Sequence, residues 1–121
     1  MKPEKITFSY DAEADVLYIA FGTNRPAIGL LINDSLLLRV DQRMKALIGL
    51  SIFDYRMTAK KDRLELYGLQ EMSPEARDFA LALLHKAPLN RLLALVHNRR
   101  NQLYVNPLFR DLRIENLLMA A

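Results

Sequence analysis

The chain has 121 residues, of which 51% are hydrophobic and 26% are charged, and its formal net charge at pH 7 is +3. This length and balance are typical of a folded globular chain rather than a disordered one, and we expect residues 1–121 to form a single domain. The sequence contains no cysteine, which excludes disulfides, thiolate metal sites and cysteine nucleophiles.

The first half, residues 4–57, has the alternation of apolar and polar residues that is typical of β-strands. KITFSY places Ile6, Phe8 and Tyr10 on one side of a strand. Further strand segments follow at DVLYIAF, AIGLLI, SLLLRVD and ALIGLSIF, joined by turns of a few residues. Because such short links pair neighbouring strands as antiparallel hairpins, we predict an antiparallel sheet of about five strands.

The second half, residues 72–121, is predicted to be helical. Ser73 followed by Pro74 and Glu75 is a helix start signal, in which serine caps the first turn and proline takes the first helical position. We expect this helix to run to about Lys86, before the next proline interrupts it.

Two more helices are predicted from the spacing of apolar residues. The second opens at Pro88, and its apolar residues recur at helical spacing: Leu89, Leu92, Leu93 and Val96. The third opens at Asn106-Pro107 and has the same spacing: Ile114, Leu117, Leu118 and Ala121. The sequence leaves residues 58–71 and 101–106 open, although RLELYGL in the first of these favours a strand.

The simplest assembly of these elements is an α+β fold, in which the C-terminal helices pack on one face of the antiparallel sheet. The other face would then carry the apolar side chains of Val16, Tyr18 and Ala20 in one strand and Leu37 in another. This is more apolar surface than a single small domain usually hides. We therefore expect a homodimer.

Three carboxylates at alternate positions precede the second strand: Asp11, Glu13 and Asp15. A calcium loop of the EF-hand type is excluded, because the sixth and twelfth positions counted from Asp11 are Val16 and Gly22. A hydrolytic pair of carboxylates is a second alternative, but it needs a cleft that this short polar loop does not suggest. We favour a structural turn, in which Asp11 accepts hydrogen bonds from the backbone N–H of Glu13 or Ala14.

The motif Y-D-x-E-x-D-x-L-Y-I at residues 10–19 resembles the opening of a small prokaryotic family, domain of unknown function family 2283. The resemblance covers about residues 9–55 and extends to G-L-S-I at residues 49–52. Two departures are Ser51, where the family usually has glutamate, and Q-R-M-K at residues 42–45 in place of an Asp-Gly turn. The resemblance implies a compact β domain without established catalysis, and some relatives are suspected of acting beside partner proteins in toxin–antitoxin-like pairs.

The remaining chemistry-bearing residues do not form a known catalytic or metal-binding motif. His85 and His97 are the only histidines, and neither has the spacing of a metal site, so we expect both at helix ends or on the surface. No nucleophile elbow, P-loop or dinucleotide-binding motif is present. We therefore predict a protein without catalytic residues, metal or cofactor, and not an enzyme.

The segment HNRRNQLY is the best candidate for contact with a nucleic acid. Between Lys86 and Arg113 there are six basic side chains and one acidic side chain. The arginines that would contact phosphates are Arg99, Arg100, Arg110 and Arg113. The alternative is a solvated helix end, where cations complement the helix dipole, and we favour this second interpretation.

No segment has the features of a secretory signal or a membrane span. MKPEKITFSY carries charges where a signal peptide needs an unbroken apolar run, and the longest apolar runs fall far short of the ~18 residues of a membrane helix. We expect a soluble, cytoplasmic protein that associates with itself and with a second small protein. The alternative function is nucleic-acid binding through the basic C-terminal half.

Overall fold

The computed structural model describes residues 5–22, 25–98, 100 and 102–111. Its strands (β), α-helices (α) and 3-10 helices (η) follow in chain order: β1 (Ile6–Asp11), β2 (Val16–Phe21), β3 (Ile28–Asn33), β4 (Leu36–Val40), β5 (Leu47–Phe53), α1 (Tyr55–Thr58), β6 (Leu64–Glu65), η1 (Tyr67–Glu71), α2 (Pro74–Leu84), η2 (Leu89–Arg91), β7 (Leu93–His97), β8 (Leu103–Pro107) and η3 (Leu108–Asp111). The fold is a mixed α+β fold composed mostly of strands.

The first half of the chain forms a five-stranded antiparallel sheet in the order β1-β2-β5-β4-β3. This confirms the predicted sheet. The pairs β1/β2 and β3/β4 are hairpins with short turns, as the short links between strands require. The strand β5 pairs with both hairpins and lies between β2 and β4, so β1 and β3 become the two edges of the sheet.

One face of this sheet, the inner face, is buried. In β2 the side chains of Leu17, Ile19 and Phe21 are at most 2% exposed, and Leu17 and Ile19 lie opposite Ile52 and Leu50 of β5. The same hydrophobic cluster includes residues from the second half of the chain, among them Leu69, Ala80, Leu84, Leu93, Val105 and Phe109. Both halves of the sequence therefore contribute to one core.

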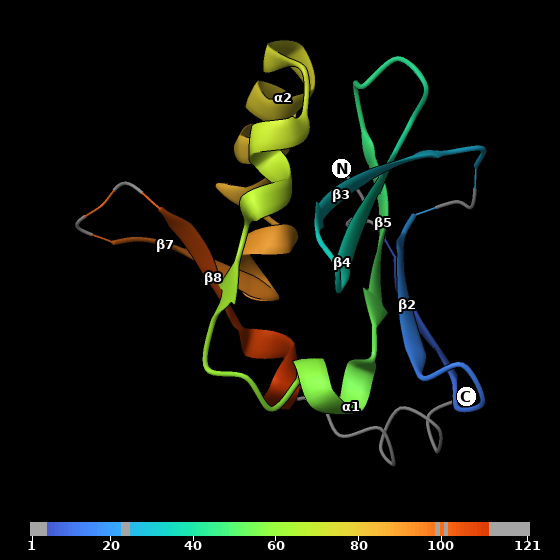
Figure 1. Ribbon diagram of the computed structural model, residues 1–121. Helices are drawn as coiled ribbons and strands as arrows, with labels where there is room; N and C mark the ends of the chain where they lie inside the picture. The colour runs from blue at the N-terminus through green and yellow to red at the C-terminus, as the bar shows by residue number, and fades with distance from the viewer. Residues whose placement is uncertain (1–4, 23–24, 99, 101, 112–121) are drawn as a thin grey trace.

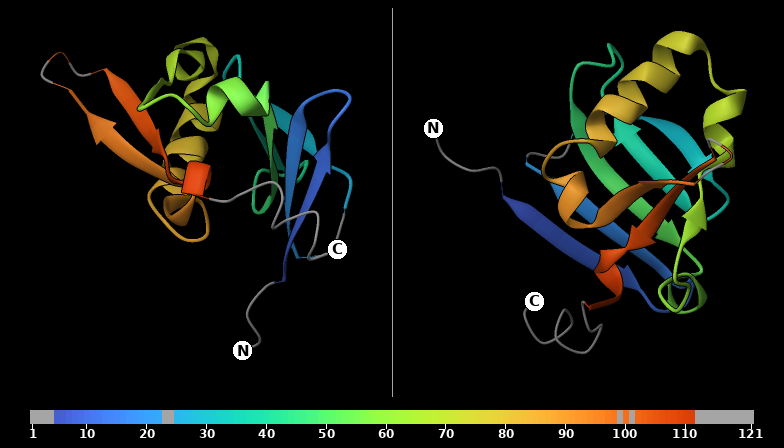
Figure 2. Two further views of the ribbon diagram at one scale, coloured as in Figure 1. Left: turned by 90° about the horizontal axis from the view of Figure 1, so that it is seen from below. Right: turned by 90° about the vertical axis from the view of Figure 1, so that its left-hand side faces the viewer.

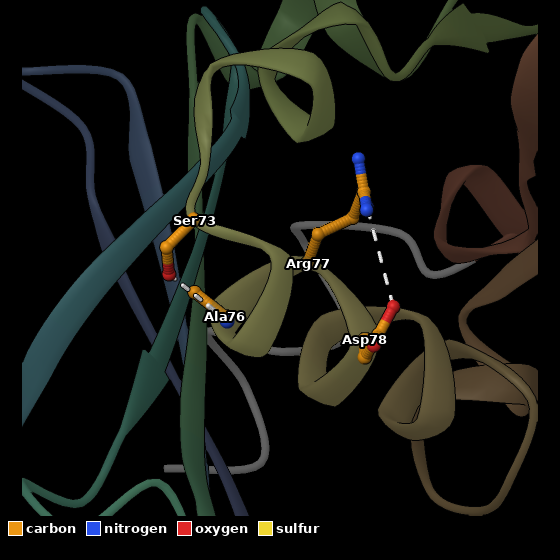
Figure 3. Close-up of polar contacts among 4 residues, drawn as sticks. All are labelled: Ser73, Ala76, Arg77 and Asp78. Carbon is orange, nitrogen blue, oxygen red and sulfur yellow. Dashed lines mark hydrogen bonds and ion pairs between the residues drawn. The ribbon is translucent and has the colours of Figure 1, made fainter.

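The helix α2 starts where the sequence predicts. The Ser73 hydroxyl oxygen accepts a hydrogen bond from the backbone N–H of Ala76 at 3.2 Å, and Pro74 is the first helical residue (Figure 3). The helix ends at Leu84, two residues before the predicted Lys86. A long ion pair of 4.0 Å between Arg77 and Asp78 is exposed and adds little to stability (Figure 3).

The predicted second helix from Pro88 is wrong. Leu89–Arg91 form the short η2, and Leu93–His97 form β7, which pairs with β8 at Leu103–Pro107. The leucines have helical spacing, but the segment also alternates, and β8 follows close behind with a matching alternation. Pairing of the two strands outweighs the weak local preference for helix.

The second half is therefore not a helical half. Beyond α2, its described part consists of two strands and two 3-10 helices. The predicted third helix corresponds at its start to η3, and the rest of its apolar stripe lies in residues 112–121, outside the described part of the chain. The second open segment, 101–106, falls mainly in β8, which also pairs with the short β6 to complete a three-stranded sheet.

The segment that the sequence left open at 58–71 covers one edge of the large sheet. It contains β6 and η1, and η1 lies against β3. The close approach is made at Gly68, where an added Cβ atom would meet the carbonyl oxygen of Leu31 and lie 2.8 Å from the carbonyl carbon of Ile32. A glycine at this place lets η1 pack directly on the backbone of the edge strand.

The elements form layers (Figures 1 and 2). The helix α2 and the small sheet β6-β8-β7 lie on the same side of the five-stranded sheet, and the views of Figure 2 agree on this arrangement. The buried side chains fill the space between these layers. The described residues contain no helix with the length and apolarity that a membrane crossing needs.

Candidate association surface

The face of the five-stranded sheet that points away from α2 is here called the outer face. Strand alternation and register assign these residues to it: Thr7, Ser9, Asp11, Val16, Tyr18, Ala20, Gly29, Leu31, Leu37, Arg39, Gly49, Ser51 and Phe53. The sequence predicted that Val16, Tyr18 and Ala20 share one face and that Leu37 lies on the outside of its own strand. The register places all four on the outer face, but Val16 is only 7% exposed and so adds little apolar surface.

An apolar row crosses the middle of the outer face. Tyr18 lies opposite Ser51, which lies opposite Leu37, which lies opposite Leu31. Tyr18 is 40% exposed and Leu31 is 46% exposed, although both are large and apolar in most of their surface. No described helix or strand packs over this row (Figures 1 and 2).

Glycines on this face allow side chains to lie flat across it. An added Cβ atom at Gly29 would come within 2.8 Å of Leu37 Cδ1, and one at Gly49 would come within 2.7 Å of the Ile19 carbonyl oxygen and lie 3.7 Å from Arg39 Nη1. Leu37 thus covers the backbone at Gly29, and the Arg39 guanidinium reaches over Gly49. The result is a flat surface, apolar at its centre, with a charged group at its margin.

The first carboxylate of the acidic triplet closes the turn between β1 and β2. Asp11 Oδ1 accepts hydrogen bonds from the backbone N–H groups of Glu13 and Ala14, each at 3.1 Å. These are the two bonds that the sequence suggested. Glu13 is exposed, and the described residues contain no group of three or more histidines and carboxylates that would hold a metal ion.

Asp15 has a different role from Asp11. Its Oδ1 accepts a hydrogen bond from the phenol of Tyr10 at 2.6 Å, and its Oδ2 accepts one from the backbone N–H of Arg56 at 3.3 Å. The backbone of Asp15 is left-handed, with a φ of 55°, and its carbonyl accepts from the backbone N–H of Tyr55. Asp15 therefore ties the β1/β2 hairpin to α1.

The hydrogen bond to Asp15 raises the pKa of Tyr10, because it holds the phenol proton. Because the pKa of Tyr10 is higher in the folded state than in the unfolded state, the hydrogen bond stabilises the fold at pH values below the ordinary tyrosine pKa of about 10. This contribution is lost as the pH rises through the pKa of the folded state. We expect the free energy of unfolding to fall more steeply above pH ~10 in the wild type than in Tyr10→Phe. Urea titrations at several alkaline pH values measure this difference.

Parallel slopes for the wild type and Tyr10→Phe would contradict the role given to this hydrogen bond.

The two histidines are exposed and lie on different elements. His85 caps the C-terminal end of α2, and its Nδ1 lies 2.7 Å from the carbonyl oxygen of Leu81. This is the helix-end position that the sequence predicts. His97 is the last residue of β7, at the end of a strand rather than of a helix. The two side chains do not belong to a common site.

The basic segment HNRRNQLY forms the turn of the β7/β8 hairpin and not a helix end. Asn98 organises this turn: its Oδ1 accepts from the backbone N–H groups of Arg100 and Gln102, each at 2.9 Å. The hairpin extends away from the rest of the molecule (Figure 1), so it carries the exposed Arg100 outward. On β8, close to this turn, the Tyr104 ring centroid lies 5.2 Å from the guanidinium carbon of Arg63.

The four arginines proposed for nucleic-acid contact are not all at this turn. Arg100 is in it, and Arg110 belongs to η3. Arg99 and Arg113 lie outside the described residues. The sequence analysis missed the hairpin because the spacing of leucines in the preceding segment suggested a helix. The available signal was that Leu93, Leu95 and His97 occupy every second position, which is the period of a strand.

An open cavity of about 250 Å³ lies between β3 and η1. Its lining includes Leu31, Asp34, Tyr67, Glu71 and Met72. The Tyr67 hydroxyl accepts a hydrogen bond from the backbone N–H of Asp34 at 2.9 Å, which joins the two walls. This hydrogen bond holds η1 against the sheet.

Comparison with known proteins adds no relative from which a role could be transferred. The resemblance of residues 9–55 to a family of small prokaryotic domains stays a prediction from the motif. The interpretation of the surfaces above therefore depends on their geometry and chemistry. No protein-family model, no curated protein and no solved structure matches the chain.

Proposed function

We propose that this protein is a non-enzymatic association module that works as a homodimer through its outer face. The observation that carries the proposal is the apolar row across this face, in which Tyr18 and Leu31 are 40% and 46% exposed. Contiguous apolar surface of this kind is typical of an interface between proteins. An aromatic residue near its centre matches the composition of interface hot spots.

The shape of the surface also supports this proposal. Two β-sheets pack face to face when their side chains are mostly apolar and of limited height, at a separation of about 10 Å. The outer face has this character, because Gly29 and Gly49 lack side chains and Ala20 and Ser51 are small. A second copy of the same face would bury the exposed Tyr18 and Leu31.

Two carboxylates of the acidic triplet are engaged within the fold, which supports a non-enzymatic role for the triplet. Asp11 accepts hydrogen bonds from backbone N–H groups, and Asp15 accepts them from a phenol and a backbone N–H group. Chemistry of the kind that paired carboxylates perform needs two such groups facing a substrate. A second protein partner would have to use another surface or compete for the outer face.

Light scattering coupled to size exclusion tests the proposal directly. At micromolar concentration we expect twice the mass of the 13.9 kDa chain, with dissociation on dilution. A monomer at concentrations up to about 100 μM would count against the proposal, since typical specific complexes are populated well below this range.

The hairpin geometry favours a second candidate function, which is nucleic-acid binding. The turn that carries Arg100 extends from the body, and Tyr104 and the amide groups of Asn98 and Gln102 lie close to it. Arginines and amides on an extended β-hairpin can contact phosphates and the edges of bases. The positive charge of the second half of the chain supports the same function.

If this second function is correct, Arg99→Ala combined with Arg100→Ala should weaken binding to a mixed-sequence DNA or RNA by about tenfold or more, because each phosphate contact contributes to counterion release. The slope of log K against log[salt] should become less steep by about 1 to 2. Electrophoretic mobility shifts at several salt concentrations measure both quantities.

The control is Lys60→Ala combined with Lys61→Ala, which removes the same charge from another exposed segment. Equal losses for the two double variants would indicate a general charge effect instead of a site at the hairpin.

A further inference from the structure

The outer face carries one charge of each sign, at positions that are separated both across and along the strands. Asp11 is on the edge strand β1, in the row that continues through Val16 and Phe53. Arg39 is on β4, in the row that passes through Gly49. Neither side chain makes an ion pair with another described residue, and the Asp11 Oδ2 atom is not used by the turn that its Oδ1 closes.

The register fixes how far apart the backbones of Asp11 and Arg39 lie. From β1 to β4 there are three steps between neighbouring strands, by way of β2 and β5. At about 4.8 Å for each step, this is about 14 Å across the sheet. From the row of Asp11 to the row of Arg39 there are four residues along a strand, from Val16 to Ala20, which is also about 14 Å. The line between these two backbone positions therefore runs at about 45° to the strands, and its midpoint falls between Tyr18 and Ser51. The Arg39 guanidinium itself lies over Gly49 in the single chain.

We infer that two copies of the chain pack outer face to outer face with their strands crossed at about 90°, so that Asp11 of each copy pairs with Arg39 of the other. This inference depends on the proposed homodimer and gives its geometry. A two-fold axis in the plane of the interface exchanges two points when it is perpendicular to the line joining them and passes through its midpoint. An axis at about 45° to the strands rotates one sheet by about 90° relative to the other, which is one of the two preferred arrangements of packed sheets.

The same axis brings the apolar rows of the two copies together. It places Leu37 of the partner subunit between Val16 and Phe53, and it brings Tyr18 over Ser51 and Tyr18 of the partner subunit. The exposed Tyr18 rings of the two copies would therefore be buried at the centre of the interface.

An aligned arrangement does not pair these two charges. With the axis parallel to the strands, Asp11 on the edge strand β1 would face the opposite edge strand, β3, which has no basic residue on the outer face. With the axis perpendicular to the strands, Asp11 would face Thr7 of the partner subunit. Only the crossed arrangement pairs both charges, and it does so twice in each dimer.

Charge reversal in trans tests the inference. Asp11→Lys and Arg39→Glu should each raise the dimer dissociation constant by about 100-fold or more, because each homodimer then contains two pairs of like charges. Mixing the two variants should restore association as a heterodimer, since Lys at position 11 of one chain faces Glu at position 39 of the other, and the remaining Asp11 faces the remaining Arg39. Sedimentation velocity of each variant and of the equimolar mixture gives these constants.

The control is Glu13→Lys, which makes the same charge change in the same turn and should leave the dissociation constant within about threefold. Thermal unfolding shows whether each variant is folded. If Asp11→Lys does not fold, a double-mutant cycle of Asp11→Asn and Arg39→Gln replaces it, because the asparagine amide oxygen can still accept the turn hydrogen bonds. Strong coupling between these two positions supports the inference, and additive effects overturn it.

The outcomes separate the inference from the proposed function. A wild-type dimer that Tyr18→Arg dissociates, but whose charge-reversed variants do not recombine, would overturn the crossed arrangement and leave the outer face as the interface. A monomeric wild type would overturn both.

Discussion

Gly68→Ala is expected to destabilise the fold by about 3 kcal/mol or more. An added Cβ atom at this position meets the carbonyl oxygen of Leu31 and lies 2.8 Å from the carbonyl carbon of Ile32. Both obstacles belong to the backbone of β3, so no side-chain rotation relieves the overlap. The segment η1 would have to move away from the sheet, and it would lose the packing of the buried Leu69. Urea unfolding followed by circular dichroism measures the loss.

Gly29→Ala is the matched control for this prediction. Its added Cβ atom comes within 2.8 Å of Leu37 Cδ1, which is the far end of a flexible side chain. We expect a cost below about 1 kcal/mol, because Leu37 can turn away and alanine is the better strand residue. Equal losses in the two variants would show that the close packing of η1 on β3 is not what requires Gly68.

Tyr18→Arg is expected to convert the proposed dimer to a monomer, with a dissociation constant raised by about 100-fold or more. Because a two-fold axis passes through the interface, each dimer would receive two new positive charges near its apolar centre. The folding stability should change by no more than about 0.5 kcal/mol, since Tyr18 is 40% exposed in the single chain. Light scattering and thermal unfolding of the same samples separate the two effects.

Met57→Arg provides a control that adds the same charge at another exposed apolar position. Met57 is 63% exposed and lies on α1, outside the outer face. This variant should remain dimeric. Dissociation of both variants to the same degree would argue that added charge alone, and not its position on the outer face, prevents association.

Local chemistry was sufficient to predict much of this fold. The period-two alternation of KITFSY and DVLYIAF indicated the strands β1 and β2, and the Asp11 carboxylate had the right spacing to close the turn between them. Ser73 and Pro74 marked the start of α2 for the same reason, because a cap acts on the backbone within three residues. In each case the deciding interactions lie within a few residues of each other in the chain.

The prediction for residues 88–98 failed where a distant segment decided the structure. The leucine spacing from Leu89 to Val96 fits a helix, yet residues 93–97 form β7 because β8 offers a complete set of backbone partners. The hairpin, its turn at Asn98 and the outward position of Arg100 all follow from that pairing. Helix spacing in a short leucine-rich segment is weak evidence when an alternating segment lies nearby in the chain.

For the candidate interface, the sequence by itself determined which residues of each strand share a face, because side chains alternate along a strand whatever the neighbouring strands are. It thereby identified Val16, Tyr18 and Leu37 as candidates for an outer apolar surface. Only the tertiary structure decided that β5 lies between β2 and β4, and so how far Asp11 stands from Arg39. The order of strands depends on long-range pairing and on burial of the inner face against α2 and the small sheet, and no local pattern encodes these contacts.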